Sequence, residues 1–550
     1  DPSWHEAEAW LEIARDLVEL VVPWEAAVLQ IVLPHLEREV ERAQTARGWM
    51  TFTDMVQDLD RALHGPDGDA LVATLRGRWR MALVDEFQDT DPAQWRILDR
   101  IFGQSPEHRL VLVGDPKQAI YGFRGADVQT YLDATKTQRE RGARRVRLAR
   151  CFRSTPALVQ ALNRLLEPGP PEASFFSGPV HLEAPLVPGQ PDLQGLTRGD
   201  EALAPVELLL WPEDEPVEPR RAARQRLARG IAEHLADLLG AAAVDGAPLR
   251  GGDVFVLTRT TREARTAVDA LRRRGLAAHQ LERNGWAQSR EAGDVLAILS
   301  AFEDPTDSGR ALGAFETPFF GVPPEALAGC RHLPPGHPWS ERLFRGAQLA
   351  DQRRWADLYA LLVDEASAAA RALADPELRS RWPVFEAVLD ATLFFAERAR
   401  ASVTEVMRWL AERGDAAPVD APDIAPVDAG PDAIRVCTMH GAKGLEADVV
   451  VVFGALFASE RRLAPYRADD GWRVHVGPDA PEAALRQHDE EEERLLYVAI
   501  TRARRHLILP AFAGAPGIDG PYARVDRALA RWRGTPAFAG RRLPSPSRGS

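Results

Sequence analysis

Residues 83–92 read Leu83-Val84-Asp85-Glu86-Phe87-Gln88-Asp89-Thr90-Asp91-Pro92, and this stretch decides how the rest of the chain is interpreted. The apolar run 81–84 predicts a buried strand that ends at two adjacent carboxylates, Asp85 and Glu86. A helix is expected next, with Asp91 as N-cap and Pro92 at its first position. Ligands of open α/β sheets gather at the carboxyl ends of strands. The Asp-Glu pair therefore suits Mg²⁺ on a nucleotide phosphate, although by itself it fits a solvated strand end equally well.

A second predicted strand, at residues 109–113, ends in a similar way. It runs into Gly114-Asp115-Pro116-Lys117-Gln118-Ala119-Ile120-Tyr121-Gly122-Phe123-Arg124-Gly125-Ala126-Asp127. Gly114 permits a tight turn, and the amide of Gln118 can hydrogen-bond a γ-phosphate oxygen. The aromatic rings of Tyr121 and Phe123, with Arg124 beside them, suit base stacking and contact with a nucleic-acid backbone. An isolated aromatic pair would more often lie in a core.

These two segments and three later ones occur in the order found in superfamily 1 helicases of the UvrD/Rep/RecB type, which the chain resembles. The later segments are Arg150-Cys151-Phe152-Arg153-Ser154-Thr155, Cys437-Thr438-Met439-His440-Gly441-Ala442-Lys443-Gly444-Leu445-Glu446 and Glu492-Glu493-Arg494-Leu495-Leu496-Tyr497-Val498-Ala499-Ile500-Thr501-Arg502-Ala503. Residues 52–55 and 317–320 resemble two further segments of these helicases more weakly. The amino-acid sequence of the first two segments most resembles that of RecB, the beta subunit of exodeoxyribonuclease V. The resemblance spans roughly residues 50–510.

The resemblance implies an ATP-dependent 3′→5′ DNA helicase or translocase of DNA repair and recombination, acting in double-strand break processing. By matching position, Asp85 would bind Mg²⁺, Glu86 would orient the hydrolytic water and Gln118 would sense the γ-phosphate. The remaining implied nucleotide contacts are Phe152 on the adenine, Arg153 and Arg502 on the γ-phosphate, and Glu446 from the second motor domain. The implied single-strand track consists of Tyr121, Phe123, Arg124 and His440.

Physical chemistry supports part of this assignment. Guanidinium forks stabilise the charge of a transferring phosphoryl group. Because Arg153 and Arg502 are far apart in sequence, we expect both to reach one nucleotide only when two domains close on it. The helix before Arg502 is expected to begin with Glu490–Glu493 and to end in a basic cluster, which favours the helix dipole. Arg504 and Arg505 are therefore expected to be structural or to steer phosphates, and His440 alone would suggest a hydrogen-bonded loop residue.

The fold expected from the resemblance and the element order is α/β, with two RecA-like parallel-sheet motor domains, the first incomplete, and an α-helical insertion in the second. Strands are expected at 80–84, 109–113, 145–149, 206–210 and 253–258, with a helix at 221–239. Two units are expected from the first motor domain: a helical accessory segment that ends an insertion in that domain (1–50) and the C-terminal part of the domain (51–140). The second motor domain is expected in two parts, 141–322 and 431–515, separated by the helical insertion and its linker (323–430). A partly disordered tail (516–550) is expected at the end.

Composition sets further limits. A chain of 550 residues is too long for one core, and 45% apolar with 27% charged residues describes a globular protein without a membrane span, expected in the cytoplasm. The net charge of −13 leaves local basic stretches to decide any nucleic-acid contact. The chain has three lysines, Lys117, Lys136 and Lys443, and none lies in a G-x-x-x-x-G-K-[ST] phosphate loop. We therefore expect a fragment that lacks this loop and the nuclease domain of RecB-like proteins.

Three alternatives remain open at this level. The parent protein is expected to be a motor that uses ATP and Mg²⁺ on single-stranded or duplex DNA, with RecC- and RecD-like subunits as partners. The alternative from another functional class is a helicase-like scaffold without catalytic activity, which binds DNA or a partner subunit. A stand-alone UvrD-like repair helicase is the third. The chain itself is expected to hydrolyse ATP poorly or not at all.

Overall fold

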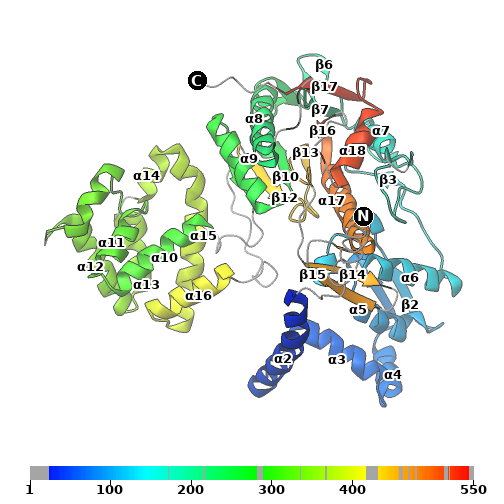
Figure 1. The fold of residues 1–550 in the computed structure, drawn as a ribbon, viewed down its shortest axis with the longest axis horizontal. Helices are drawn as coiled ribbons and strands as arrows, with labels where there is room; N and C mark the ends of the chain where they lie inside the picture. Colours follow the sequence, from blue (N-terminus) through cyan, green and yellow to red (C-terminus); the bar gives the residue numbers. More distant parts are fainter. Residues whose placement is uncertain are drawn as a thin grey trace, which may run out of the picture.

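The computed structural model describes residues 24–543, apart from 171–172, 213–214, 216, 218, 282–288, 335, 366–367, 416–431, 458–462, 469–470, 477–479, 513–517 and 519–520. Figure 1 shows an α/β body around a large sheet, a smaller α/β body formed by the blue N-terminal part, and a separate bundle of helices drawn in green and yellow. The mixed α/β fold with a parallel motor-type sheet agrees with the fold class expected from the sequence.

The large body is built on a seven-stranded parallel sheet in the order β11-β12-β10-β13-β16-β7-β17. Its central strands are continuous apolar runs, such as Val449–Val452, because a parallel sheet is covered on both faces. The strands are β7 (Val206–Leu210), β10 (Val254–Thr258), β11 (Ala278–Gln280), β12 (Ile434–Thr438), β13 (Ala447–Val452), β16 (Ala503–Ala511) and β17 (Phe538–Arg542).

Helices cover both faces of this sheet. Figure 1 shows α8 (Arg220–Leu239) and α9 (Thr261–Arg273) on one side, and α7 (Pro156–Leu166), α17 (Glu482–Ile500) and α18 (Pro521–Ala530) on the other. The strands expected at 206–210 and 253–258 and the helix expected at 221–239 are confirmed to within a residue. Between residues 521 and 543, within the range expected to be a tail, α18 packs on β16 and β17 adds an edge strand beside β7.

The smaller body contains the two strand ends on which the sequence argument depends. The parallel strands β1 (Met81–Val84) and β2 (Arg109–Leu112) confirm the expected strands at 80–84 and 109–113. Asp91 caps α5 (Pro92–Leu98) as expected, since its carboxylate accepts the backbone N–H groups of Ala93 (2.8 Å) and Gln94 (2.9 Å). The other helices of this body are α3 (Phe52–His64), α4 (Gly68–Arg78) and α6 (Val128–Glu140).

The sheet of the smaller body has two strands within the described residues. Its apolar side chains are poorly covered: Leu83 is 67% exposed and Val111 is 40% exposed. The strand expected at 145–149 is wrong. This segment is extended and exposed, and it does not join a sheet because no described strand lies beside it; pairing begins only at β3 (Arg150–Cys151), with β4 (Val187–Pro188).

The third body is a helical bundle with its own hydrophobic core. Helices α10 (Arg290–Glu303) and α11 (Ser308–Phe315) supply part of that core, so the helical unit starts upstream of residue 323. Aromatic rings such as Phe319 and Phe385, 5.0 Å apart, lie at its centre. The remaining helices are α12 (Pro338–Asp351), α13 (Trp355–Ala360), α14 (Ala368–Ala374), α15 (Pro376–Ala399) and α16 (Val403–Asp415).

Two further elements project from these bodies. Helix α2 (Trp24–Arg47) exposes apolar residues such as Ile31 and Val40 along its length. An antiparallel hairpin, β14 (Leu463–Ala468) with β15 (Gly471–Val476), lies near α2 and the smaller body in Figure 1. Across the described ranges, every helix is too short or too polar to cross a bilayer.

Helix α17 carries a buried carboxylate that makes stability depend on pH. The carboxylate of Glu493 accepts the N–H (2.8 Å) and the hydroxyl (3.0 Å) of Ser177, and it lies 3.2 Å from Arg524. Burial nevertheless dominates and raises the pKa of Glu493 to about 7. The folded state therefore binds a proton that the unfolded state has already released between pH 4.5 and 7, so stability falls as pH rises through that window.

Glu493→Gln should remove this dependence, because the amide oxygen can still accept from Ser177 and the amide does not titrate. We expect the wild type to lose about 2 kcal/mol relative to the variant between pH 5 and pH 8. Urea unfolding at several pH values measures the difference. Parallel stability curves for the two proteins would contradict the assignment.

Candidate functional site

The carboxyl end of β1 presents the first two candidate residues. Asp85 and Glu86 are both exposed, and Asp85 Oδ1 accepts the backbone N–H of Glu86 at 2.9 Å. Glu86 adopts a left-handed backbone conformation with φ 51°, which is uncommon for a residue with a side chain. The amide of Gln88 donates a hydrogen bond to the Glu86 carboxylate. The turn after β1 thus turns the two acidic side chains away from the sheet and fixes one of them.

The end of β2 is tied to the same turn. Gln88 Oε1 accepts the backbone N–H of Asp115 at 2.9 Å. A Cβ on Gly114 would lie 2.7 Å from that oxygen, so this close approach requires glycine. Asp115 in turn accepts from Lys117 Nζ (2.7 Å) and from the side-chain amide of Gln118 (3.2 Å). Gln118 therefore lies beside the Asp85–Glu86 turn, as its expected role requires.

Two candidate arginines lie together on the larger body. Arg153 donates to Glu446 Oε2 at 2.8 Å and to the carbonyl of Thr501 at 3.1 Å. Arg502 follows Thr501 and donates to the carbonyl of Val498 at 2.9 Å. Both arginines belong to one body, because the loop after β3 is hydrogen-bonded directly to the start of β16. That they reach one nucleotide only when two domains close stays a prediction. Of the carboxylates near them, Glu446 comes from the larger body and Glu86 from the smaller one.

The charges at this point form an arrangement that favours an anion. Arg502 is 2% exposed, and burial together with the nearby positive charge of Arg153 lowers its pKa to about 10. The negative charges of Glu86 and Glu446 raise the pKa of Arg502, so both carboxylates lie within electrostatic range of it. Two guanidinium groups held close together, one of them buried, are costly unless a negative group neutralises them. A polyphosphate has the required charge and acceptor atoms.

Lys443 is a functional candidate that sequence reasoning missed. This buried side chain comes from the larger body, and its Nζ contacts the Asp89 carboxylate and lies 3.6 Å from Glu86 Oε2. It also donates to the carbonyl of Gln118 at 3.2 Å and lies 4.9 Å from the ring centre of Tyr121. The scarcity of lysine, three in the whole chain, was the available signal. Lys443 joins the nucleotide candidates to the aromatic segment.

Three of the expected DNA contacts lie together. The rings of Tyr121 and Phe123 are 6.0 Å apart, and Phe123 is 5.5 Å from the ring of His440, both in edge-on arrangements. Phe123 is 61% exposed, so its face can accept a base. The side chain of Arg124 lies outside the described residues. The expected aromatic track is therefore an exposed cluster contributed by both α/β bodies.

Phe152, expected to stack on adenine, is 59% exposed at the end of β3. Its ring lies against Gly189, where a Cβ would be 2.7 Å from the nearest ring carbon. The glycine backbone supports one face of the ring and leaves the rest open. A flat, exposed aromatic ring next to Arg153 suits a purine base.

The described residues fit Mg²⁺ and ATP in part. Carboxylate oxygens at Asp85 suit Mg²⁺, which usually binds one or two carboxylates together with substrate phosphates. Within the ranges that the structure covers, His, Cys, Asp and Glu do not form a cage of three or more metal ligands. Lys117 and Lys443 are held by Asp115 and Asp89. A lysine for the β- and γ-phosphates would have to come from elsewhere.

The helix before Arg502 differs from its expected charge pattern. Glu490–Glu493 lie in the middle of α17, which begins at Glu482, and Arg502, Arg504 and Arg505 follow its last residue, Ile500. The helix dipole therefore does not explain these charges. Arg505 is structural: it is buried between Asp448 (2.9 Å) and Asp245 (2.7 Å). Glu492 likewise forms an ion pair with Arg259 at 2.6 Å.

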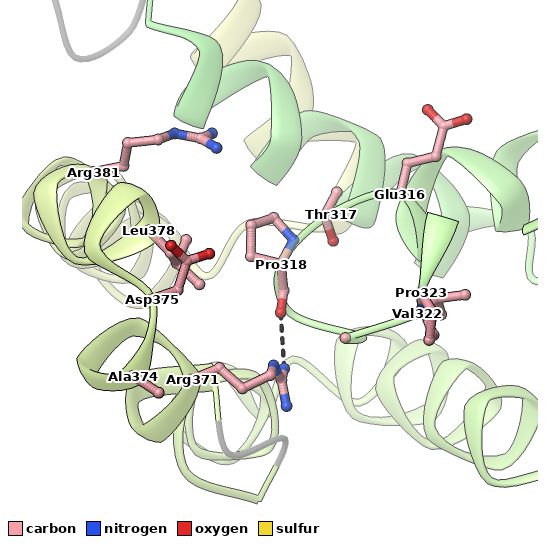
Figure 2. A pocket seen from close by; sticks show the side chains of 11 residues that line it. Glu316, Thr317, Pro318, Val322, Pro323, Arg371, Ala374, Asp375, Leu378 and Arg381 are labelled. Carbon is pink, nitrogen blue, oxygen red and sulfur yellow. Dashed lines mark hydrogen bonds between the residues drawn. The ribbon is translucent and has the colours of Figure 1, made fainter. Parts of the chain in front are cut away.

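The helical bundle contains a separate hollow of about 560 Å³. Figure 2 shows Arg371 reaching the carbonyl of Pro318, at 2.8 Å, beside residues 317–320 of the weaker sequence resemblance. Arg381, on the other side of the hollow, binds Glu291 (2.6 Å) and Asp294 (3.0 Å). These arginines hold the bundle together, and the hollow lies apart from the nucleotide candidates.

Two helicase domain families match the chain. The UvrD/REP helicase N-terminal domain matches residues 22–139, and the UvrD-like helicase C-terminal domain matches residues 423–513. The first contains both strand ends with Asp85 and Gln118, and the second contains Lys443 and Arg502. The chain therefore contains matches to both the N-terminal and the C-terminal domain of UvrD-type helicases.

Within that class the chain is similar to RecB. The RecBCD enzyme subunit RecB of Mycolicibacterium smegmatis is 30% identical over 519 residues, which cover 89% of this chain and 44% of the relative. RecB of Escherichia coli (strain K12) is 28% identical over 516 residues, covering 88% and 41%. RecB of Haemophilus influenzae is 26% identical over 502 residues, covering 84% and 38%. The chain thus spans less than half the length of these relatives.

Proposed function

We propose that this chain is part of an ATP-driven DNA helicase or translocase that acts in DNA repair and recombination. One observation carries the proposal: Lys443 of the larger body contacts the Asp89 carboxylate of the smaller body and lies 3.6 Å from Glu86, which is also within electrostatic range of Arg502. An exposed aromatic cluster adjoins that site through Lys443. A catalytically inactive scaffold would have no chemical need for this combination.

The proposed mechanism assigns a task to each group. Asp85 would hold Mg²⁺, and the bound ion would neutralise phosphate charge on ATP. Glu86 orients the attacking water and takes its proton, and Gln118 contacts the γ-phosphate. Arg153 and Arg502 stabilise the charge of the phosphoryl group as it transfers. Closure of the two bodies on ATP and their release after hydrolysis would move the aromatic track along the strand.

The phosphate loop is proposed to enter from polypeptide that is not in this chain. A hollow of about 530 Å³ separates Pro116, after β2, from Arg145 on the extended segment. Val111 on β2 and Leu148 on that segment, 80% exposed, leave apolar surface open there. Parallel strands are normally paired and covered on both faces. A strand followed by a glycine-rich loop would fill this gap and bring a lysine toward Asp85.

The proposal extends to polarity and partners. Relatives with this arrangement are named subunits of the RecBCD enzyme, which supports RecC- and RecD-like partners and a role in double-strand break processing. Movement in the 3′→5′ direction and a cytoplasmic location are part of the same proposal. Co-purification with a RecC- or RecD-like subunit tests the partners and separates the proposal from a stand-alone repair helicase.

The chain of residues 1–550 is expected to bind single-stranded DNA yet to hydrolyse ATP slowly. Of its three lysines, Lys117 and Lys443 are already paired with carboxylates, and Lys136 lies on α6 and not in a G-x-x-x-x-G-K-[ST] loop. Loss of phosphate contacts of this kind costs about a thousandfold in turnover. A DNA-stimulated ATPase assay on the purified chain, with fluorescence anisotropy of labelled oligo-dT, measures both properties. Brisk DNA-stimulated turnover by the chain alone would contradict the proposed missing loop.

A further inference from the structure

The segment from Asp115 to Asp127 joins the nucleotide site to the DNA track, and one face of α17 contacts it. The contact is direct as far as Gly122 and continues to Asp127 through Arg467 of β14. The residues of this contact face recur every three or four positions and therefore share one side of the helix. They are Gln487, Glu491, Arg494 and Tyr497.

At the nucleotide end the contact face is buried. The hydroxyl of Tyr497 is hydrogen-bonded to the Asp115 carboxylate, and burial together with that negative charge raises the pKa of Tyr497. Three residues earlier on the helix, Arg494 Nε donates to the carbonyl of Ala119 at 2.8 Å. Both contacts fix the segment that carries Gln118.

At the DNA end the contacts continue in the same order. Glu491 Oε1 accepts the backbone N–H of Gly122 at 3.2 Å. The side-chain amide of Gln487 exchanges two 2.8 Å hydrogen bonds with the backbone of Arg467 on β14, and the Arg467 guanidinium contacts the Asp127 carboxylate. The helix thus runs antiparallel to the segment and contacts it near both ends.

The position of Glu491 is informative because charge alone disfavours it. A carboxylate beside the aromatic track repels DNA phosphates. Gly122 lies between Tyr121 and Phe123, and a Cβ there would be 2.9 Å from Glu491 Oε1. The carboxylate is therefore packed directly against the backbone that holds both rings. Its contribution is to fix that backbone.

We propose that Glu491 is a positioning residue for the single-strand track and that α17 couples this track to the nucleotide site. The inference rests on the proposed function, since it takes Tyr121 and Phe123 as DNA contacts. The stretch from Gln487 to Tyr497 covers about 15 Å of rigid helix, and the helix ends just before Arg502. A shift of the aromatic backbone is transmitted along α17 to the two arginines.

The test compares two variants that remove the same charge. Glu491→Gln keeps an acceptor oxygen for Gly122, whereas Glu491→Ala removes it. Binding of a fluorescein-labelled oligo-dT of about 20 nucleotides is measured by anisotropy at one salt concentration. We expect Glu491→Ala to bind about tenfold more weakly than wild type and Glu491→Gln to bind at least as tightly. Glu482→Ala is the matched control, because Glu482 lies on the exposed first turn of the same helix.

Gly122→Ala tests the contact from the other side. The backbone of Gly122 does not need a positive φ, so the obstacle to alanine is Glu491. We expect Gly122→Ala to weaken binding by a similar factor, and the double variant Gly122→Ala/Glu491→Ala to bind no more weakly than Glu491→Ala alone. Gly122→Ala by itself keeps the test available if Glu491→Ala does not fold.

The outcomes separate the two proposals. Tighter or unchanged binding by Glu491→Ala, which simple charge removal predicts, would overturn the role of Glu491 and leave the proposed function intact. Strictly additive losses in the double variant would also overturn it. Failure of the wild type to bind single-stranded DNA would instead defeat the proposed function, and this inference with it.

Discussion

Glu86→Gln is expected to abolish ATP-driven strand separation while leaving ATP binding in place, in a polypeptide that joins this chain to a phosphate-binding loop. The amide is nearly the same size as the carboxylate and can still accept the hydrogen bond from Gln88, so the turn after β1 should keep its shape. It cannot take the proton of the attacking water. General-base catalysis contributes about 10²–10⁴-fold, and we expect a loss of that order in turnover.

Steady-state ATPase and strand-displacement assays measure the loss, and binding of a fluorescent ATP analogue measures what is retained. Glu107→Gln is the control, since Glu107 is an exposed carboxylate of the same body. Retention of turnover within tenfold of wild type would show that Glu86 does not orient the water. A parallel loss of nucleotide binding would point to a structural role for the carboxylate.

Arg502→Ala is expected to have the second large effect, in the same polypeptide. Arginines that stabilise the transferring phosphoryl group are worth about 10³–10⁵-fold in turnover. Arg502 is buried and held by the carbonyl of Val498, and burial together with the nearby positive charge of Arg153 lowers its pKa. Bound phosphate would supply a negative charge beside both guanidinium groups. Removal of Arg502 should therefore lower turnover much more than it lowers DNA binding.

Arg153→Ala is the companion variant, because Arg153 is more exposed and its loss should leave the fold intact. We expect a loss of comparable order, with thermal unfolding within a few degrees of wild type. Arg504→Ala is the matched control: Arg504 lies 3.5 Å from the same Glu446 carboxylate, and we expect it not to reach phosphate. If Arg504→Ala lowered turnover as much as Arg153→Ala, the assignment of the two phosphate arginines would be wrong.

Local sequence signals predicted much of the fold because their causes are local. The apolar run before Asp85 formed β1, and Asp91 with Pro92 started α5, since caps and strand ends depend on a few neighbouring residues. The strand expected at 145–149 failed for the opposite reason. Its residues favour an extended backbone, but a strand forms only when another strand pairs with it.

The candidate site shows the same division. Asp85, Gln118 and Arg502 could be named from the sequence because each lies in a motif, and the motifs occur in a recognisable order. The partners of Lys443, Tyr497 and Glu491 could not, since they lie hundreds of residues away along the chain. That Arg153 and Arg502 reach one nucleotide only on domain closure stays a prediction; that both lie on one body could not be read from their sequence distance, which does not report where a loop packs.

The sequence by itself therefore determined the chemical groups available to this protein: paired acids after one strand, an amide after the next, and arginines near two later motifs. It also indicated the class, since five ordered motifs resemble those of UvrD-type helicases and two domain families of that type match the chain. Only the tertiary structure decided which groups oppose one another, that α17 links the aromatic cluster to the arginines, and where an additional strand has room. Those relations depend on packing between distant segments, and that packing is established only when the whole chain folds.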